Sequence, residues 1–297
     1  MSNLKNILGP MRLPFVILTP ACVLLGLGTA IWTAGVVNTL HFILALVGAV
    51  SAHICVNAFN EYFDYRSGLD FRTQRTPFSG GSGTLPENPQ LENTALATAI
   101  ITLVVTGSVG FFFLGVWGLS LLPLGLLGLL LLVTYTPWFT RYPFLCLVSP
   151  GLGFGTLMVI GTDFVLSGEY SWTAFIASLI PFFLVSDLLL LNQFPDVEAD
   201  RSIGRRHYPI TIGRQKSSLI YVSFLGLAYL SILIGVLINL LPPTALIGLI
   251  TLVIAVPTAM RAYRHAEDLE NLIPALGMNV LINILTPTLT AVGLFLG

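Results

Sequence analysis

The sequence has few charged residues. Only 9% of its 297 residues are Asp, Glu, Lys or Arg, whereas 55% are hydrophobic and the mean hydropathy is +0.88. A soluble domain carries about 25% charged residues, so this chain has too little charge to solvate a globular surface. The composition excludes a soluble fold and predicts an integral membrane protein.

A basic excess and paired cysteines are also missing. The formal net charge is −1 and no long basic tract occurs, so nothing indicates a nucleic-acid partner. Cys22, Cys55 and Cys146 lie in or near apolar runs, and no two of them have metal-ligand or redox spacing. We interpret them as small packing residues. The brief N-terminal stretch shows no small-residue cleavage site, so we do not expect a removed signal peptide.

Long apolar segments dominate the chain instead. A helix needs about 20 apolar residues to cross the hydrocarbon core, and nothing here alternates in the manner of an outer-membrane barrel. The sequence predicts an all-α membrane protein with a single domain over residues 1–297. Nine segments are predicted to span the membrane: 13–37, 40–60, 94–115, 118–136, 144–166, 173–194, 218–241, 244–260 and 275–296.

Lys and Arg fall only in alternate connections between these segments. With the N-terminus in the cytoplasm, the positive-inside rule places all 13 of them on the cytoplasmic side. We therefore predict a multi-pass protein with a cytoplasmic N-terminus, a C-terminus on the opposite face, and two long cytoplasmic loops at about 61–93 and 195–217. The basic residues are Lys5, Arg12, Arg66, Arg72, Arg75, Arg141, Arg201, Arg205, Arg206, Arg214, Lys216, Arg261 and Arg264.

Polar residues gather at the cytoplasmic end of the second segment, in "NAFNEYFDYRSGLD". At about 100° per residue on a helix, Asn57, Asn60 and Asp64 fall within about 60° of one another, and His53 joins them one turn deeper. Asp70 follows in the loop and is able to return toward the same membrane end. The second segment is thus predicted to carry a polar stripe that runs from within the membrane to its cytoplasmic mouth.

A second acidic cluster follows the sixth segment, in "NQFPDVEADRSIGRRH". Asn192, Asp196 and Asp200 repeat every four residues, so one helix would present them on one face. Pro195 is expected to kink that helix. Because both clusters lie at the same end of the membrane segments, we expect them to form one shared site.

The residue types of these clusters indicate a metal-bound diphosphate. Carboxylate and amide oxygens suit Mg²⁺, and no set of Cys and His offers a zinc alternative. Carboxylates without a cation between them would repel one another strongly. Arginine forks match phosphate oxygens, so we interpret the nearby arginines as phosphate ligands. These arginines are Arg66, Arg72, Arg75, Arg201, Arg205 and Arg206.

A less specific interpretation stays open for single residues. Charged residues at helix ends are commonly interfacial anchors, although polar groups inside the membrane are expensive and usually functional. Hydrogen bonds between helices would by themselves explain His53 and Asn57. The sequence does not assign Asp163, near the outer end of the fifth segment, or Asp187, which faces about 140° away from Asn192 on a helix.

These motifs resemble the UbiA superfamily of intramembrane aromatic prenyltransferases, and the likeness covers most of the chain. Its first motif matches Asn60 and Asp64 in "NEYFDYRSGLD", a form closer to the 1,4-dihydroxy-2-naphthoate branch. Its second motif matches Asn192, Asp196 and Asp200, and "DVEADRSIGRRHYPITIGR" is similar to the family's continuation of it.

The resemblance implies a bundle of nine helices around a central cavity, with two Mg²⁺ ions that bridge the diphosphate of a polyprenyl donor. It also implies roles for individual residues. The implied catalytic residues are Asp64, Asp70, Asp196 and Asp200. The implied metal ligands are Asn60, Asp64, Asn192, Asp196 and Asp200. The implied diphosphate-binding residues are Arg12, Arg75, Arg141, Tyr135 and Arg201.

The chain departs from the family pattern in three places. "RTPFSGGSGTLPENPQ" is not the usual loop after the first motif, Arg141 stands alone where many members have two cations, and His207 stands where Thr is common. These departures leave the acceptor more open than the reaction.

The reaction implied is transfer of a polyprenyl group to an aromatic ring. Tyr135 would shield the allylic cation by a cation–π contact in a water-poor cavity, with 66–90 as a mobile lid. Asp64 or Asp70 would assist deprotonation of the acceptor. The favoured acceptor is 1,4-dihydroxy-2-naphthoate, in menaquinone or phylloquinone biosynthesis. The other acceptors considered are 4-hydroxybenzoate, homogentisate, chlorophyllide and a glycerol phosphate.

Two other classes of protein remain as alternatives. A divalent-cation or small-molecule transporter would use the same acids, but transporters usually bind near the membrane midplane between inverted repeats, and no repeat is evident here. A structural or quinone-binding membrane protein is the other alternative. We therefore expect an enzyme that transfers the polyprenyl group to an aromatic acceptor. We expect it to lie in the lipid bilayer and to have no nucleic-acid partner.

Overall fold

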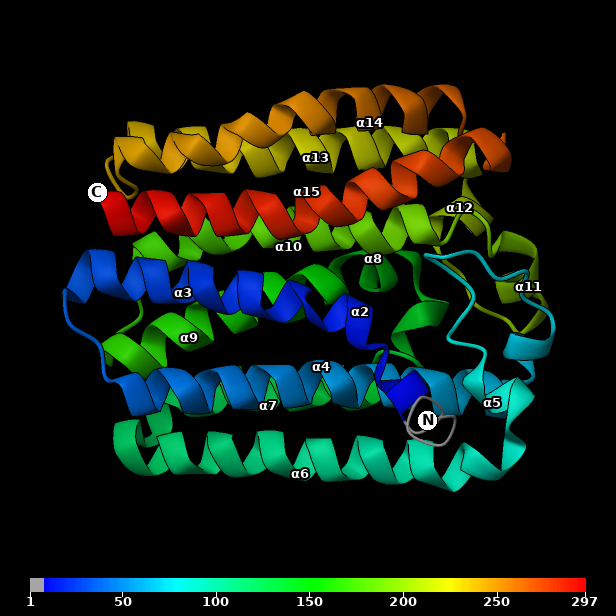
Figure 1. The fold of residues 1–297 in the computed structure, drawn as a ribbon, viewed down its shortest axis with the longest axis horizontal. Coiled ribbons are helices and arrows are strands. Elements are labelled where there is room, and N and C mark those ends of the chain that lie inside the picture. Colours follow the sequence, from blue (N-terminus) through cyan, green and yellow to red (C-terminus); the bar gives the residue numbers. More distant parts are fainter. Residues whose placement is uncertain (1–7) are drawn as a thin grey trace.

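The structure is a computed structural model that describes residues 8–297 (Figure 1). Every regular element in this range is a helix, which confirms the predicted all-α class. Lys5, one of the basic residues behind the predicted orientation, lies outside the range. The longer helices are α3 (Leu18–Ala34), α4 (Thr39–Ser67), α6 (Glu92–Trp117), α7 (Leu122–Thr134), α8 (Pro143–Gly151), α9 (Met158–Ser167), α10 (Trp172–Asn192), α13 (Arg214–Leu237), α14 (Leu252–Arg264) and α15 (Leu269–Leu296).

Shorter helical turns extend or connect these helices. The π-helical turn η6 joins α8 to α9, and the 3-10 helix η7 leads into α14, so each pair forms one continuous span. The shorter elements are η1 (Gly9–Met11), α2 (Leu13–Val16), η2 (Leu69–Phe71), α5 (Thr84–Glu87), η3 (Pro89–Leu91), η4 (Gly118–Leu121), η5 (Phe139–Arg141), η6 (Leu152–Leu157), α11 (Val197–Ser202), α12 (Tyr208–Thr211) and η7 (Pro243–Thr251).

The number of membrane-spanning helices differs slightly from the predicted nine. Within residues 8–297, seven helical stretches are long and apolar enough to cross a membrane, or eight when Gly9–Val16 and Leu18–Ala34, bent by 45°, count as one span. The difference lies in the 46-residue stretch Pro89–Thr134, which contains two predicted segments. Because α6 and α7 contact each other, the chain turns back at η4, where Gly118 has a non-helical φ of 71° and ψ of −161°. The chain is a multi-pass integral membrane protein.

The helix that carries the first acidic cluster has clear ends. The side chain of Asn38 accepts hydrogen bonds from the backbone amides of Leu40 and His41, at 2.9 and 3.2 Å, and so forms an N-cap. Gly68 ends α4 with a φ of 77°, a left-handed conformation that favours glycine. The helix therefore continues to Ser67 rather than to residue 60, and Asp64 lies within it.

α10 lies at the centre of the bundle. Its membrane-spanning window is 67% buried, against 11% for Pro89–Thr134, and α10 contacts α3, α8, α13 and α15. The core around it includes Leu25, Ile180, Leu184, Tyr221 and Ile232. A bundle of this kind holds the end of α10 rigidly, because the central helix is fixed by neighbours on several sides.

Glycines allow the close crossing of α8 and η6 against α10. A Cβ atom on Gly151 would lie 2.1 Å from the carbonyl oxygen of Phe182, and one on Gly155 would lie 2.3 Å from the Phe182 amide nitrogen. Side chains are therefore not tolerated at either position. The small residues of "LVSPGLGFG" therefore allow close contacts between helices.

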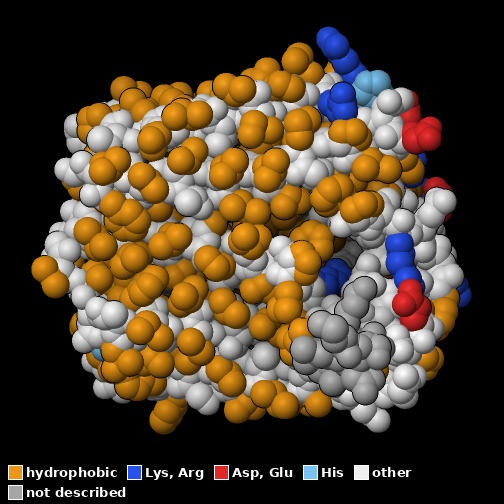
Figure 2. All heavy atoms as spheres, in the orientation of Figure 1, with side chains coloured by type: hydrophobic (Ala, Val, Ile, Leu, Met, Phe, Trp, Pro, Cys, Tyr) orange, Lys and Arg blue, Asp and Glu red, His pale blue; other side chains and the backbone are white. Residues whose placement is uncertain are grey.

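The two acid-bearing connections lie at the same end of the bundle. Figure 1 shows α5, α11 and α12 together at the right-hand end, with the C-terminus at the opposite end. On the face drawn in Figure 2, charged side chains gather at that right-hand end, beside a hollow, and hydrophobic side chains cover the rest. The charged groups are thus concentrated where the apolar spans end.

Candidate active site

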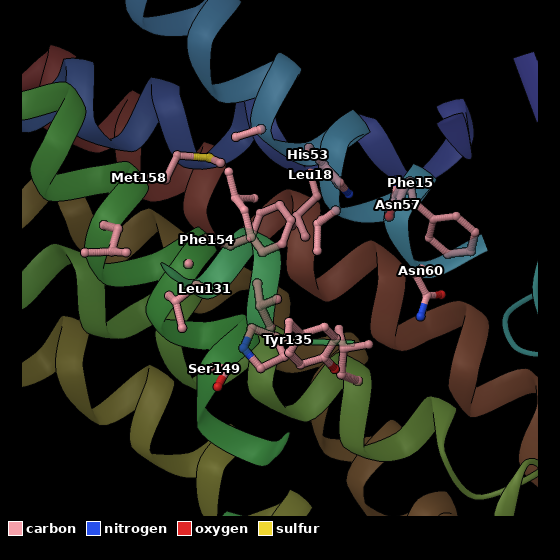
Figure 3. Close-up of a pocket in the computed structure, with 18 of the residues that line it drawn as sticks. Phe15, Leu18, His53, Asn57, Asn60, Leu131, Tyr135, Ser149, Phe154 and Met158 are labelled. Carbon is pink, nitrogen blue, oxygen red and sulfur yellow. The ribbon is translucent and has the colours of Figure 1, made fainter. Parts of the chain in front are cut away.

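A cavity of about 670 Å³ opens at this end of the bundle and runs inward between the helices. Side chains from α4, α10 and α11 make its mouth polar and charged. Farther in, Leu131 of α7, Phe154 of η6 and Met158 of α9 line apolar walls (Figure 3). The cavity therefore joins a charged mouth to a hydrophobic interior.

α4 places the first cluster on the wall of this cavity. Asn57, Asn60 and Asp64 all line it, in agreement with their predicted common face, and His53 lines it at a deeper level. Past the end of α4, η2 brings Asp70 to the same cavity. Asp64 and Asp70 are both 6% exposed, so two carboxyl groups are nearly enclosed at the mouth.

The second cluster also lines the mouth, but it does not lie on one helix. The expectation of a single kinked helix is wrong, because α10 ends at Asn192, Pro195 lies in a turn, and α11 begins just after Asp196. Proline lacks the amide donor and disfavours a helical residue before it, so the helix stops. Asn192, Asp196 and Asp200 nevertheless reach the same cavity from these two elements.

The two clusters meet at Arg205. One guanidinium nitrogen, Nη2, contacts a carboxylate oxygen of Asp64, and Nη1 lies 2.9 Å from Oδ1 of Asp200. His207 Nε2 lies 3.0 Å from the other oxygen of Asp200. Gly204 turns the chain here with a φ of 82°, and the Arg205 amide bonds back to the carbonyl of Asp200. The acids of α4 and α11 are thus joined by one arginine, whose side chain is 14% exposed.

Arg205 is outside the five diphosphate-binding residues that the family resemblance implies. It belongs to the arginines noted near the clusters, but nothing in the spacing distinguishes it from Arg201 or Arg206. A glycine just before it, at the end of a short helix, is the one local signal of a reversal that returns the side chain to the acids.

Glu61 is a second residue that sequence reasoning missed. Its fully buried carboxylate accepts from Arg12 Nε at 2.7 Å, and it also accepts from the Ser82 amide and hydroxyl at 2.7 and 2.8 Å. A Cβ on Gly81, whose φ is 74°, would lie 3.0 Å from Asp70. Glu61 therefore fixes both Arg12 and the glycine-rich loop against the mouth.

Three arginines of the diphosphate-binding set that the resemblance implies do not line the cavity. Arg75 pairs with Glu87 at 3.0 Å, Arg201 pairs with Glu198 at 3.0 Å, and Arg141 is exposed. Arg12 and Tyr135, the other two members of that set, do line it.

The two unassigned acids lie away from the cavity lining. Asp163 in α9 is fully buried and accepts a hydrogen bond from Ser171 Oγ at 3.0 Å, which ties α9 to the N-cap residue of α10. Asp187 in α10 is also fully buried, and neither of its carboxylate oxygens has a hydrogen-bond partner in residues 8–297.

Burial and mutual repulsion shift the pKa values of the carboxyl groups at the mouth. Burial, together with the charges of Glu61 and Asp64, raises the pKa of Asp70 to about 7. Burial, with repulsion from Asp200, likewise raises the pKa of Asp196 to about 7. Burial also disfavours the charged form of Asp200, but the hydrogen bond with His207 and the positive charge of Arg205 outweigh it and lower the pKa of that carboxyl. The mouth therefore mixes paired and unpaired carboxyl groups.

The unpaired oxygens fit a hard divalent cation. Asp70 Oδ2, Asn192 Oδ1 and Asp196 Oδ1 are buried without a hydrogen-bond partner in the described chain. Carboxylate and amide oxygens are the ligands that Mg²⁺ prefers. Within residues 8–297 no three Asp, Glu, His or Cys side chains converge closely enough to hold an ion. A cation here would therefore take amide or ligand oxygens as well, as Mg²⁺ commonly does with substrate phosphates.

The chain matches a known family over most of its length. Residues 19–273 match the family model described as "UbiA prenyltransferase family". Two curated relatives are both named 1,4-dihydroxy-2-naphthoate octaprenyltransferase. The relative from Bacillus subtilis is 26% identical over 65% of this chain and 62% of its own length. The relative from Haemophilus influenzae is 23% identical over 88% of this chain and 85% of its own length.

Solved structures share the fold. The apo structure of a UbiA homologue from Aeropyrum pernix K1 has a TM-score of 0.73 at 19% identity and covers 96% of this chain and 98% of that one. A UbiA homologue from Archaeoglobus fulgidus, bound to DMAPP and Mg²⁺, has a TM-score of 0.61 at 13% identity and covers 97% and 99%. At these identities the likeness concerns the fold alone.

Proposed function

Because the chain belongs to the UbiA prenyltransferase family, we propose that it moves a polyprenyl group from its diphosphate to an aromatic acceptor within the membrane. One observation carries the proposal: Asp64 and Asp200, from two distant motifs, meet at Arg205 at the mouth of an apolar-walled cavity. Such an arrangement suits a substrate with an anionic head and a greasy tail.

The anionic head binds at the mouth in this proposal. Arg12 and Arg205 face the diphosphate with their guanidinium forks, which match phosphate oxygens. Asn60, Asp64, Asn192, Asp196 and Asp200 are the proposed metal ligands, by analogy with the homologue that holds DMAPP and Mg²⁺. Mg²⁺, when bound, supplies the positive charge that stabilises a leaving diphosphate. The number of ions that we propose is two.

The exposed arginines take a different part. Arg75, Arg141 and Arg201 do not line the cavity, so we propose that they attract the anionic donor to the mouth rather than bind it in the reacting position. Charges of this kind raise association rates and are screened by salt.

The apolar interior receives the polyprenyl tail. On its far side, Gly107, Leu126 and Leu129 line both the cavity and a groove on the outer surface between α6 and α7. Leu126 is 57% exposed on that surface, which faces lipid in a membrane. A tail longer than the cavity therefore has a route into the bilayer at this seam.

Bond making and breaking are proposed to occur between the mouth and this interior. The C–O bond to the diphosphate breaks, a C–C bond forms between the allylic carbon and a ring carbon, and that ring carbon releases a proton. Tyr135 shields the positive charge on the allylic group. Asp70 accepts the proton, since burial raises its pKa to about 7 and its Oδ2 has no partner in residues 8–297.

We propose 1,4-dihydroxy-2-naphthoate as the acceptor. Both curated relatives carry that substrate in their names, and the motif "NEYFDYRSGLD" has the form closer to that branch. The product would then be a precursor of menaquinone or phylloquinone.

The orientation that we propose keeps the mouth in the cytoplasm. Among residues 8–297, the helix ends and loops that carry Lys and Arg lie at the end where the cavity opens (Figure 1). The C-terminus lies at the other end. Labelling of single cysteines placed at Gln74 and Val36 in intact membranes tests this, and labelling of Val36→Cys alone from the cytoplasmic side would reverse the orientation.

An assay of detergent-purified protein tests the function. We expect a prenylated naphthoate product when Mg²⁺, labelled octaprenyl diphosphate and 1,4-dihydroxy-2-naphthoate are supplied, with less product from 4-hydroxybenzoate or homogentisate. Asp64→Asn and Asp196→Asn should abolish product, whereas Glu169→Gln, an exposed acid at the opposite end, should not. Absence of labelled product with every acceptor in the wild-type protein would contradict the proposal.

A further inference from the structure

Beyond the acidic clusters, the polar wall that α4 forms continues deeper into the cavity, where the proposed chemistry does not use it. His53 and Asn57 of α4 line it, and Phe154 of η6 lies across from them (Figure 3). His53 precedes Asn60 by seven residues, so it lies about 10 Å farther along the helix from the mouth. His53 is therefore too deep for a diphosphate held at the acids.

Hydrogen bonds between helices fix both side chains. Thr19 Oγ1 of α3 lies 2.8 Å from His53 Nδ1, and Asn57 Nδ2 donates to the carbonyl of Met11 at 3.1 Å. These bonds employ one polar atom of each residue. His53 Nε2 and Asn57 Oδ1 have no hydrogen-bond partner in the part of the chain that the structure describes, although His53 is only 5% exposed.

A flat aromatic surface accompanies these free atoms. The rings of His53 and Phe154 meet edge to face, with centroids 4.5 Å apart and an angle of 74° between their planes. Phe154 lies in the π-helical turn η6, and π-helical turns are rare and occur frequently at functional sites. His53 Nε2 and Asn57 Oδ1 are therefore free to form a hydrogen bond with a ligand or water in the cavity.

We propose that His53 Nε2 and Asn57 Oδ1 form the acceptor subsite, where they hydrogen-bond a ring hydroxyl of a hydroxylated aromatic that packs against Phe154. The inference rests on the proposed function and extends it. Of the two substrates, the polyprenyl tail carries no group able to form hydrogen bonds, and the diphosphate is held at the mouth. The acceptor is therefore the substrate whose chemistry matches this wall.

His53 acts as a binding residue for the acceptor. The bond with Thr19 sets the plane of the imidazole, so Nε2 is fixed before the acceptor arrives. Fixing one hydroxyl of a rigid ring also fixes the direction in which its reacting carbon faces. Reacting atoms must approach to about 3–3.5 Å, so such alignment contributes directly to the rate.

A comparison of paired acceptors tests the subsite. Turnover is measured with 1,4-dihydroxy-2-naphthoate and with the two analogues that each lack one ring hydroxyl, in the wild type and in His53→Phe. In the wild type, kcat/KM should fall at least tenfold for one of the analogues. In His53→Phe that discrimination should shrink to twofold or less, while KM for the prenyl diphosphate stays within twofold.

Control variants separate binding from structure. Tyr229→Phe removes a buried hydroxyl that bonds Thr251 at 2.8 Å outside the cavity lining, and it should leave the discrimination intact. His53→Asn keeps a hydrogen-bonding group and should restore part of it. If His53→Phe does not fold, Asn57→Leu supplies the same comparison.

The two proposals fail in different ways. If the wild-type protein transfers the prenyl group but His53→Phe and Asn57→Leu discriminate among the acceptors as the wild type does, the subsite is wrong and the function stands. If the wild type transfers nothing to any of the three naphthoates, the proposed function itself fails, and the subsite with it.

Discussion

The mouth of the cavity and its wall at α6 and α7 are built on opposite principles. At the mouth, Arg205 is held by Asp64 and Asp200, and Glu61 holds Arg12. At the wall, a Cβ atom added to Gly107, Gly110 or Gly125 would meet nothing within 4 Å. One region holds its arginines in place with paired carboxylates, and the other leaves open space.

The difference follows from what each region has to recognise. A reacting diphosphate needs charges that are already in position, because preorganised groups stabilise the developing charge without moving. A polyprenyl tail offers only apolar surface, so the wall needs room and a lipid-like lining rather than exact contacts. Substitutions at the mouth should therefore lower kcat/KM strongly for prenyl diphosphates of every length. Substitutions at the wall should lower it weakly, and by an amount that depends on the length of the donor.

Loss of Arg205 should give the largest effect. Arg205→Ala leaves Asp64 and Asp200 to repel each other and removes a phosphate ligand, so we expect kcat/KM to fall about 1,000-fold. Arg205→Lys keeps the positive charge but lacks the guanidinium fork, so its kcat/KM should fall about tenfold. Steady-state kinetics check this, with the exposed Arg261→Ala as control. Activity of Arg205→Ala within tenfold of the wild type would remove Arg205 from the site.

Metal affinity should depend on pH. Burial raises the pKa of Asp70 and of Asp196 to about 7, so below pH 7 Asp196, a proposed ligand, and Asp70, a carboxylate beside the ligands, both lose their negative charge. We expect Mn²⁺ affinity, in the presence of geranyl diphosphate, to fall about 100-fold from pH 8 to pH 6 because binding favours the ionised form of each group. Asp70→Asn and Asp196→Asn should each reduce that change about tenfold; an unaltered pH profile in both would contradict the roles of these two carboxylates.

Glu61 should matter for binding the donor. Glu61→Gln weakens the hold on Arg12 and on Ser82, and we expect a rise of about 20-fold in KM for the prenyl diphosphate with a smaller change in kcat. Glu92→Gln, which alters an exposed pair with Arg66, serves as the matched control. Equal KM values in both variants would show that Glu61 does not position the mouth.

A side chain added at the wall should give the smallest change in kcat/KM, and that change should depend on the length of the donor. Gly107→Leu places a side chain in the seam, so kcat/KM should fall about tenfold for octaprenyl diphosphate and less than twofold for geranyl diphosphate, because binding depends on apolar fit. Gly226→Leu, at an exposed glycine of α13 away from the cavity, should change neither. A uniform loss for both donors in Gly107→Leu would contradict the route through this seam.

The sequence was sufficient for the fold class and for the two motifs that line the mouth. Helical spacing placed Asn57, Asn60 and Asp64 on one face, and the structure has them on one cavity wall. The prediction from the sequence was wrong where a turn determines how the residues are arranged. Pro195 ends α10 instead of bending it, so the second motif spans two elements.

The sequence could not predict which side chains pair with one another, and the reason is physical. Arg205 and Glu61 gain their positions from partners 141 and 21 residues away, namely Asp64 and Ser82. Such contacts depend on how the helices pack, and local spacing carries no record of it. Arg75 and Arg201 show the converse, since their local partners Glu87 and Glu198 hold them outside the cavity.

The most direct test asks whether the two motifs bind one metal–diphosphate group. Mn²⁺ binding is followed by electron paramagnetic resonance with and without geranyl diphosphate, in the wild type, Asp64→Asn and Asp196→Asn. We expect geranyl diphosphate to raise the Mn²⁺ affinity of the wild type. In each single variant, this increase in affinity should be at least tenfold smaller. A variant of either motif that binds Mn²⁺ and diphosphate as the wild type does would show that the motifs do not share a site.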